Sequence, residues 1–144
     1  MAIKFAHRME NIKSSAIREL LKLTEEPSII SFAGGLPAPE LFPIKELEEV
    51  TKAVLQEEGR AALQYSTTEG YLPLRQKIAD RMKKVSVNCQ PNDILVTSGS
   101  QQGLEFSGKI FINEGDVVIC ESPSYLGALN AFKAYQPKFV EITM

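Results

Sequence analysis

Residues 96–111 read VTSGSQQGLEFSGKIF, and the periodicity of the sequence changes within this stretch. The stretch leaves the apolar run DILVT (93–97), passes through Ser98, Gly99 and Ser100, and then takes up helical spacing. Such a bend places free backbone N–H groups at the positive end of a helix dipole, which suits an anion. An ordinary strand-to-helix turn with a serine cap explains the same pattern, and neither the dinucleotide nor the P-loop glycine pattern is matched.

Strand and helix patterns alternate on both sides of this bend. We expect strands at DILVT (93–97), DVVIC (116–120) and KFVEI (138–142), with helices at 101–112 and 124–135. Alternation of this kind predicts an α/β fold with a mostly parallel sheet and crossover helices. The continuous apolar runs predict strands that are covered on both faces.

The first part of the chain predicts helices and shaped loops. A helix is expected over residues 14–24, an extended segment over 28–32, and a loop at AGGLPAPELFP (33–43). A second helix is expected from Pro43 to Gly59. A third helix follows, with an apolar side at Leu74, Ile78, Met82 and Val85 and with Arg75, Lys77, Asp80 and Arg81 as its solvated face.

The division of the chain follows from these patterns. We expect an N-terminal arm and loop segment over residues 1–44 and the first part of an α/β domain over residues 45–144. The chain stops directly after the third expected strand, so the last strand has no following helix to cover it. The sheet therefore looks unfinished, and we expect the chain to be a truncated part of a longer protein.

Composition excludes several classes of function. A formal net charge of -2 and a pI near 5.5 give no general attraction for nucleic acid. Cys89, Cys120 and the single histidine, His7, lack the spacing of a metal site. No apolar run approaches the roughly 20 residues needed to cross a bilayer. We expect a cytosolic protein without membrane, nucleic-acid or metal partners.

Three further motifs carry candidate binding residues. Tyr125 follows the strand at 116–120 and would emerge at the same sheet edge as the bend, where its ring could cover a planar ligand or join the helix core. Gly35 could offer a bare backbone N–H to a carboxylate or form a tight turn. Tyr65 offers a phenolic hydroxyl from a loop, or is a surface tyrosine.

Taken together and in this order, the motifs resemble those of fold-type I pyridoxal-phosphate enzymes. The resemblance is to class I and II aminotransferases of the branch that includes 2-aminoadipate and kynurenine aminotransferases, and it spans nearly the whole chain. The stretches that carry it are SSAIREL (14–20), ISFAGGLPAPELFP (30–43), LQYSTTEGYLPLR (63–75), ILVTSGSQQGLEF (94–106) and GDVVICESPSYLGAL (115–129).

The resemblance implies roles for individual residues. Ser100 and Gln101, with the amide of Gly99, would hold the cofactor phosphate, and Tyr125 would stack on the pyridine ring. Gly35 would donate its N–H to the α-carboxylate of the substrate.

Two further roles depend on neighbours that this sequence alone does not supply. Tyr65 would reach the phosphate bound by the other subunit of a homodimer, so the site would be shared. Arg18 matches a position near the substrate side chain in some relatives.

The resemblance also implies a reaction, which is the transfer of an amino group from an amino acid to a 2-oxo acid. No lysine here sits in the serine-rich context of the family's cofactor-linked lysine, so we assign no catalytic residue and expect the 144-residue chain alone to be inactive. The alternatives are a noncatalytic phosphate-ligand or cofactor-binding fragment, a decarboxylase or C–S lyase of the same fold, and a cofactor-sensing regulator. The last is disfavoured because only a short arm precedes Ser14.

Overall fold

The computed structural model describes residues 3–11, 28–30, 32 and 35–144. The chain forms two compact units, which we name by their content. The αβ unit comprises Met1–Ser14 with Leu72–Met144, and the helical unit comprises Ser15–Tyr71. The helix expected over residues 14–24 lies wholly outside the described residues, and so does Arg18.

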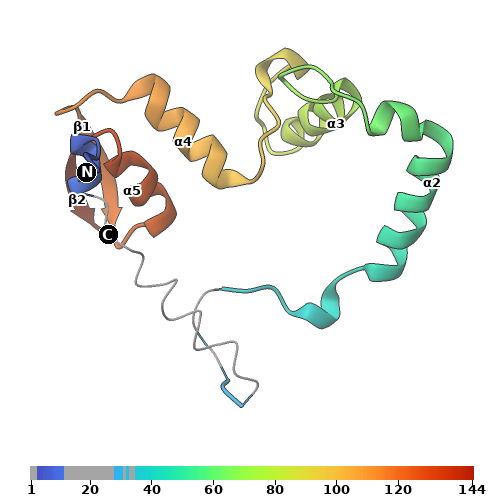
Figure 1. The fold of residues 1–144 in the computed structure, drawn as a ribbon, viewed down its shortest axis with the longest axis horizontal. Helices are drawn as coiled ribbons and strands as arrows, with labels where there is room; N and C mark the ends of the chain where they lie inside the picture. Colours follow the sequence, from blue (N-terminus) through green and yellow to red (C-terminus); the bar gives the residue numbers. More distant parts are fainter. Residues whose placement is uncertain (1–2, 12–27, 31, 33–34) are drawn as a thin grey trace. The chain divides into compact units, whose positions relative to one another are not determined.

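The helical unit is dominated by one long amphipathic helix. A short 3-10 helix, η2 (Pro39–Leu41), precedes α2 (Ile44–Ala62), which begins directly after Pro43 (Figure 1). The second expected helix is therefore confirmed, although it continues past Gly59 after a local departure from helical geometry at Glu58. Its apolar residues, which include Leu47, Val50 and Val54, remain exposed by about half.

The αβ unit contains the remaining helices and both strands (Figure 1). In chain order these are η1 (His7–Asn11), α3 (Leu72–Lys83), η3 (Pro91–Asp93), α4 (Ser100–Phe111), β1 (Val117–Ser122), α5 (Leu126–Lys133) and β2 (Lys138–Thr143). Each of the last three expected helices is present. Within the described ranges, no helix combines the length and apolar character that crossing a membrane requires.

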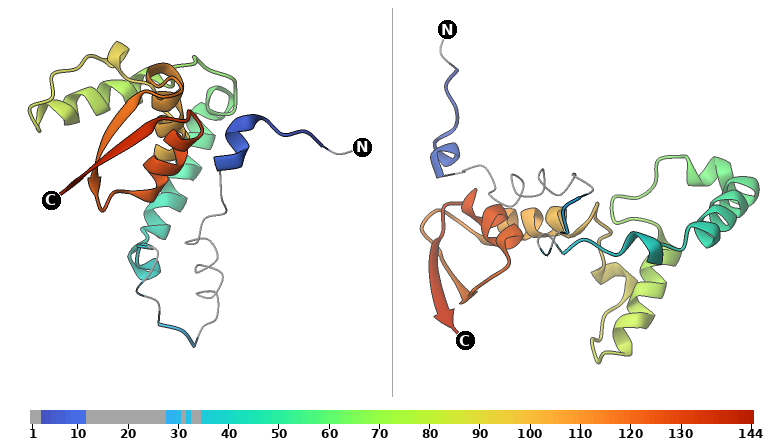
Figure 2. Two further views of the ribbon diagram at one scale, coloured as in Figure 1. Left: turned by 90° about the vertical axis from the view of Figure 1, so that its left-hand side faces the viewer. Right: turned by 90° about the horizontal axis from the view of Figure 1, so that it is seen from below.

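The strands β1 and β2 form a parallel pair that is joined through α5. Their register aligns Val117 with Lys138 and Ser122 with Thr143, and the strands lie side by side in both views of Figure 2. A parallel pair cannot be joined by a tight hairpin and needs a crossover, which α5 supplies. The expected α/β class with a parallel sheet and a crossover helix is confirmed. Val117 and Ile119 are more than 60% exposed, so the described residues do not cover both faces as predicted.

The strand expected at residues 93–97 is not formed. Ile94 has extended backbone angles (φ −117°, ψ 126°), but the only sheet in the described part of the chain contains β1 and β2. The apolar run has the composition of a strand, yet a strand also needs a neighbour for its backbone N–H and C=O groups. Here that neighbour is missing from the described residues, and Leu95 stays 47% exposed.

The face of α3 that was expected to be solvated is only partly so. Lys77, Asp80 and Arg81 are exposed, whereas Arg75 is buried to 7% exposure. Its guanidinium donates from Nη1 to the Pro91 carbonyl of η3 over 2.8 Å. A buried guanidinium requires acceptors for its N–H groups, and this carbonyl supplies one from a segment that periodicity in α3 cannot reveal.

The helices α4 and α5 pack closely and run in the same direction. Gln101 and Gly127, near the two N-termini, are hydrogen-bonded, and near the other ends Gly108 faces Phe132 and Tyr135. A Cβ at Gly108 would lie 2.7 Å from the Tyr135 ring and 3.2 Å from Phe132 Cδ1. Gly108 and Ala131 are both buried. The contact therefore depends on small residues.

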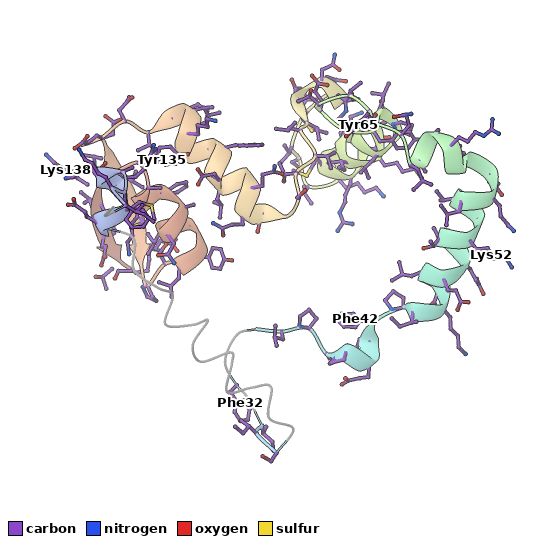
Figure 3. The ribbon with its side chains drawn as sticks, viewed as in Figure 1. Phe32, Phe42, Lys52, Tyr65, Tyr135 and Lys138 are labelled. Atoms are coloured by element: carbon purple, nitrogen blue, oxygen red, sulfur yellow. The ribbon has the colours of Figure 1, made fainter. Side chains whose placement is uncertain are left out.

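Tyr135, just after the end of α5, stabilises this contact through a hydrogen bond to α4. Its hydroxyl donates to Glu105 Oε1 over 2.5 Å, and Figure 3 shows its side chain within the αβ unit. This hydrogen bond raises the pKa of Tyr135 above 10.0, and partial burial raises it further. The neutral phenol is thus favoured in the folded protein.

We predict opposite effects for alanine at two glycines of α4. Gly108→Ala should destabilise the protein relative to Gly103→Ala by about 1–3 kcal/mol, since overpacking acts only at Gly108. A Cβ at Gly103 meets only Thr97 Oγ1 at 3.9 Å, so the matched control gains the same helix propensity without the clash. Urea unfolding of both variants at the protein's natural length measures the difference. Equal stabilities would contradict the packing described above.

We also predict an alkaline loss of stability that depends on Tyr135. Because its folded pKa is raised, the stabilising contribution is complete below the ordinary tyrosine pKa of about 10 and is lost as the pH rises through the folded value. Tyr135→Phe should flatten this part of the stability profile between pH 9 and 11.5, taken as roughly the titration range of the phenol. Tyr71→Phe, at an exposed tyrosine, is the matched control variant.

Candidate functional site

The bend at residues 97–100 forms a turn that ends at the N-terminus of α4. Gly99 is the N-cap residue, and its φ of +80° lies in the region that glycine adopts most readily. Its N–H donates to the Thr97 carbonyl over 2.9 Å, and its own carbonyl accepts from Thr97 Oγ1 over 3.0 Å. In this structure the Gly99 amide, which was expected to contact a phosphate, donates within the turn.

The next amides are those of Ser100 and Gln101, in the first turn of α4. The first N–H groups of a helix have no acceptor in a preceding turn, and none is found for these two within the described part of the chain. Both residues are exposed, and the first turn contains no acidic side chain. The arrangement suits an anion that approaches from solvent.

Tyr125 stands at the start of the neighbouring helix. It is the N-cap residue of α5, and its side chain is exposed, at 68% for the residue. The ring folds over Gly127, where a Cβ would lie 2.5 Å from Tyr125 Cε1. The ring can occupy this position because Gly127 has no side chain.

Gln101 links the two helix ends. Its Nε2 donates to the Gly127 carbonyl over 3.4 Å, so the predicted anion-binding turn and the predicted stacking ring lie together. The first turn of α5 also lacks acidic residues. Two helix dipoles therefore contribute positive potential at one place without a neighbouring carboxylate in either first turn.

The remaining predicted site residues lie elsewhere in the chain. Gly35 (φ +59°) and Tyr65 belong to the helical unit, and Tyr65 is fully exposed (Figure 3). Arg18 lies outside the described residues. The structure thus brings together Gly99, Ser100, Gln101 and Tyr125, and it describes Gly35 and Tyr65 separately from them.

Two residues of this site were missed by sequence reasoning. Gln102 accepts the Ser98 N–H at its Oε1 over 2.6 Å, and Gly127 supports the Tyr125 ring. A glutamine at the third helical position is a known capping signal, and it could have identified Gln102. A glycine two residues after a tyrosine has no comparable signature.

Across the residues that the structure describes, no group of three or more His, Cys, Asp or Glu residues is arranged to hold a metal ion. The donors at the site are backbone N–H groups and the Gln101 amide, which interact with anions.

Comparison with known proteins identifies one family. Residues 39–144 match the family model described as aminotransferase class I and II. The chain is 49% identical over 141 residues to aromatic-amino-acid aminotransferase 1 of Thermococcus litoralis, covering 97% of this chain and 34% of that protein. It is 51% identical over 131 residues to 2-aminoadipate transaminase of Thermus thermophilus, covering 91% and 32%.

A solved structure is similar over the same extent. The α-aminoadipate aminotransferase LysN of Thermus thermophilus, complexed with N-(5'-phosphopyridoxyl)-L-leucine, superposes with a TM-score of 0.82 at 47% identity. The match covers 96% of this chain and 33% of that one. The chain therefore spans about a third of the length of the relatives it matches.

We predict that Gly127→Ala displaces the Tyr125 ring at little cost to stability. The clash involves the far end of a flexible side chain, which can swing into solvent, and alanine favours the helix by about 1 kcal/mol. Urea unfolding should therefore show a change below about 1 kcal/mol, and a crystal structure should show the ring in another rotamer. A ring that keeps its position in the variant would contradict this account.

Proposed function

Because the chain belongs to the class I and II aminotransferase family, we propose that this protein transfers an amino group from an amino acid to a 2-oxo acid with the aid of pyridoxal phosphate. The observation that carries the proposal is the meeting of two helix N-termini, without acidic residues in their first turns, beside an exposed tyrosine ring. This combination suits a ligand that has both a phosphate and an aromatic ring.

The residues of the αβ unit fit such a cofactor. The N–H groups of Ser100 and Gln101 would hold the phosphate, and Tyr125 would offer its ring to the pyridine. The amide of Gly99, which donates to the Thr97 carbonyl in this structure, would turn to the phosphate when the cofactor binds, and its left-handed conformation would shape the turn. When bound, pyridoxal phosphate acts as an electron sink for the substrate amino acid.

The helical unit would supply substrate and interface residues. Gly35 has the left-handed φ that small anion-binding nests use, which supports a contact with the substrate carboxylate. The full exposure of Tyr65 leaves its hydroxyl available to the phosphate site of a partner subunit. Arg18 would face the substrate side chain. The active form would be a homodimer with shared sites.

The relatives support a proposal for the substrate class. The names of two similar proteins specify aromatic amino acids and 2-aminoadipate, so we propose a substrate with a long, aromatic or dicarboxylic side chain. The relatives' names favour transamination over the decarboxylase, C–S lyase and noncatalytic alternatives.

The free thiols of Cys89 and Cys120 support a cytosolic location.

The proton-transferring residue is not assigned within this chain. None of its lysines lies in the first turn of α4 or α5, and Lys109 falls in the last turn of α4. We propose that this residue belongs to the part of the relatives' length that the chain does not match.

We also propose that the chain divides into an arm over residues 1–44 and the first part of a cofactor domain from residue 45.

The experiment that tests this function uses the protein at its natural length. Kynurenine, 2-aminoadipate and aromatic amino acids are supplied with 2-oxoglutarate, and glutamate formation is measured. Tyr125→Ala should weaken binding of pyridoxal phosphate by about tenfold, since stacking contributes about 0.5–1.5 kcal/mol beyond burial. Tyr125→Phe is the matched control, because it keeps the ring and should retain affinity within about threefold.

Two outcomes would count against the function. Absence of both pyridoxal-phosphate binding and glutamate formation in the unaltered protein would exclude an aminotransferase. Unchanged affinity in Tyr125→Ala would leave the reaction class intact but remove Tyr125 from the cofactor site.

A further inference from the structure

The side chain of Gln102 folds back over the turn that precedes its own helix. Its Oε1 accepts the Ser98 N–H over 2.6 Å, across four residues of the chain. Gln102 is the third residue of α4, and the bond therefore bridges the two sides of Gly99. This hydrogen bond, which we call the Gln102–Ser98 bond, spans Gly99, the residue with the least restricted backbone in the turn.

The groups of the turn fall into two sets. The Ser98 N–H is taken by Gln102 and the Gly99 N–H by the Thr97 carbonyl, while the Gly99 carbonyl accepts from Thr97 Oγ1. The amides of Ser100 and Gln101 follow directly and have no acceptor among the described residues. The N–H groups of Ser98 and Gly99 are thus hydrogen-bonded within the turn, and those of Ser100 and Gln101 remain available to a ligand.

The Gln102–Ser98 bond restricts the conformational freedom of Gly99. Glycine adopts positive and negative φ about equally well, so a φ of +80° is not held by the residue itself. A Cβ placed at Gly99 would have no atom within 4 Å, and packing around it therefore does not fix the turn. The hydrogen bonds that the turn makes with Thr97 and with the accepting Oε1 of Gln102 remain as the restraints. A turn that is already ordered loses less entropy when it binds a ligand.

We propose that Gln102 is a positioning residue that preorganises the turn for the cofactor phosphate, acting through Ser98 and Gly99. This inference rests on the proposed function, because it takes the ligand of the turn to be the phosphate of pyridoxal phosphate.

The neutral charge of Gln102 is part of this role. Glutamate and glutamine both serve as back-bonding residues at the third helical position, since each has an oxygen that accepts a backbone N–H. A glutamate would place a negative charge beside a phosphate dianion, and like charges repel. Only glutamine meets both requirements: it accepts the Ser98 N–H and it leaves the potential of the helix end positive.

The test compares three variants of the protein at its natural length. Gln102→Leu removes the acceptor, and Gln102→Glu keeps an acceptor while adding charge. Gln76→Leu is the control, since Gln76 is exposed on α3 and donates to Asp80 Oδ1 over 3.4 Å. Three properties are measured for each: amide hydrogen exchange at Ser98 in the cofactor-free protein, the dissociation constant of pyridoxal phosphate, and the thermal midpoint of the cofactor-free protein.

The two Gln102 variants should separate in these measurements. Gln102→Leu should speed exchange at Ser98 and raise the dissociation constant by about tenfold, with a thermal midpoint within about 2 °C of the unaltered protein. Gln102→Glu should keep exchange at Ser98 slow yet bind the cofactor more weakly, and its deficit should shrink as salt screens the repulsion. Gln76→Leu should match the unaltered protein in all three.

Several results would overturn the positioning role. Exchange at Ser98 that is unchanged in Gln102→Leu, or an affinity within about twofold of the unaltered protein, would remove Gln102 from the argument. A fall in thermal midpoint that accompanies the loss of affinity would assign it a purely structural role. If the unaltered protein bound no pyridoxal phosphate, this inference and the proposed function would both fail, whereas normal binding with a silent Gln102→Leu would refute this inference alone.

Discussion

The close packing of α4 against α5 is the contact on which the candidate site depends. At one end it needs the absence of a side chain at Gly108, where the rings of Phe132 and Tyr135 approach the α4 backbone. Because the two helices run in the same direction, closing this contact brings their N-termini together at the other end, where Gln101 meets Gly127. A substitution far from the turn can therefore change the spacing between the amides of Ser100 and Gln101 and the ring of Tyr125. The geometry of the site is thus set partly by residues that no ligand would touch.

Periodicity predicted the elements well where a local pattern decides them. The amphipathic spacing of α2 and the alternation from α4 to β2 appear in the structure close to the expected bounds. The prediction of a strand at 93–97 was wrong because a strand needs a neighbouring strand to pair with, and composition does not say whether one is present. The prediction that Arg75 is solvated was wrong for a related reason. Its acceptor, the Pro91 carbonyl, belongs to a separate segment that the spacing within α3 does not reveal.

The candidate site shows the same division between local and nonlocal information. The sequence located the turn and Tyr125 because both follow recognisable motifs, and the structure brings them together. The sequence could not indicate that the N–H of Gly99 donates to the Thr97 carbonyl within the turn. Gln102 and Gly127 escaped notice because their contributions depend on side-chain rotamers and on the fold of a ring. Motifs identify which residues surround a ligand more readily than which atoms remain available to it.

The parallel pairing of β1 with β2 has a consequence for the order in which the protein acquires structure. Both strands and the helix that joins them lie within residues 117–143, so the pairing closes a short loop. The entropy of loop closure grows with loop length, and contacts that are local in sequence form fastest. We therefore expect this crossover to form before any pairing between strands that lie farther apart in the sequence.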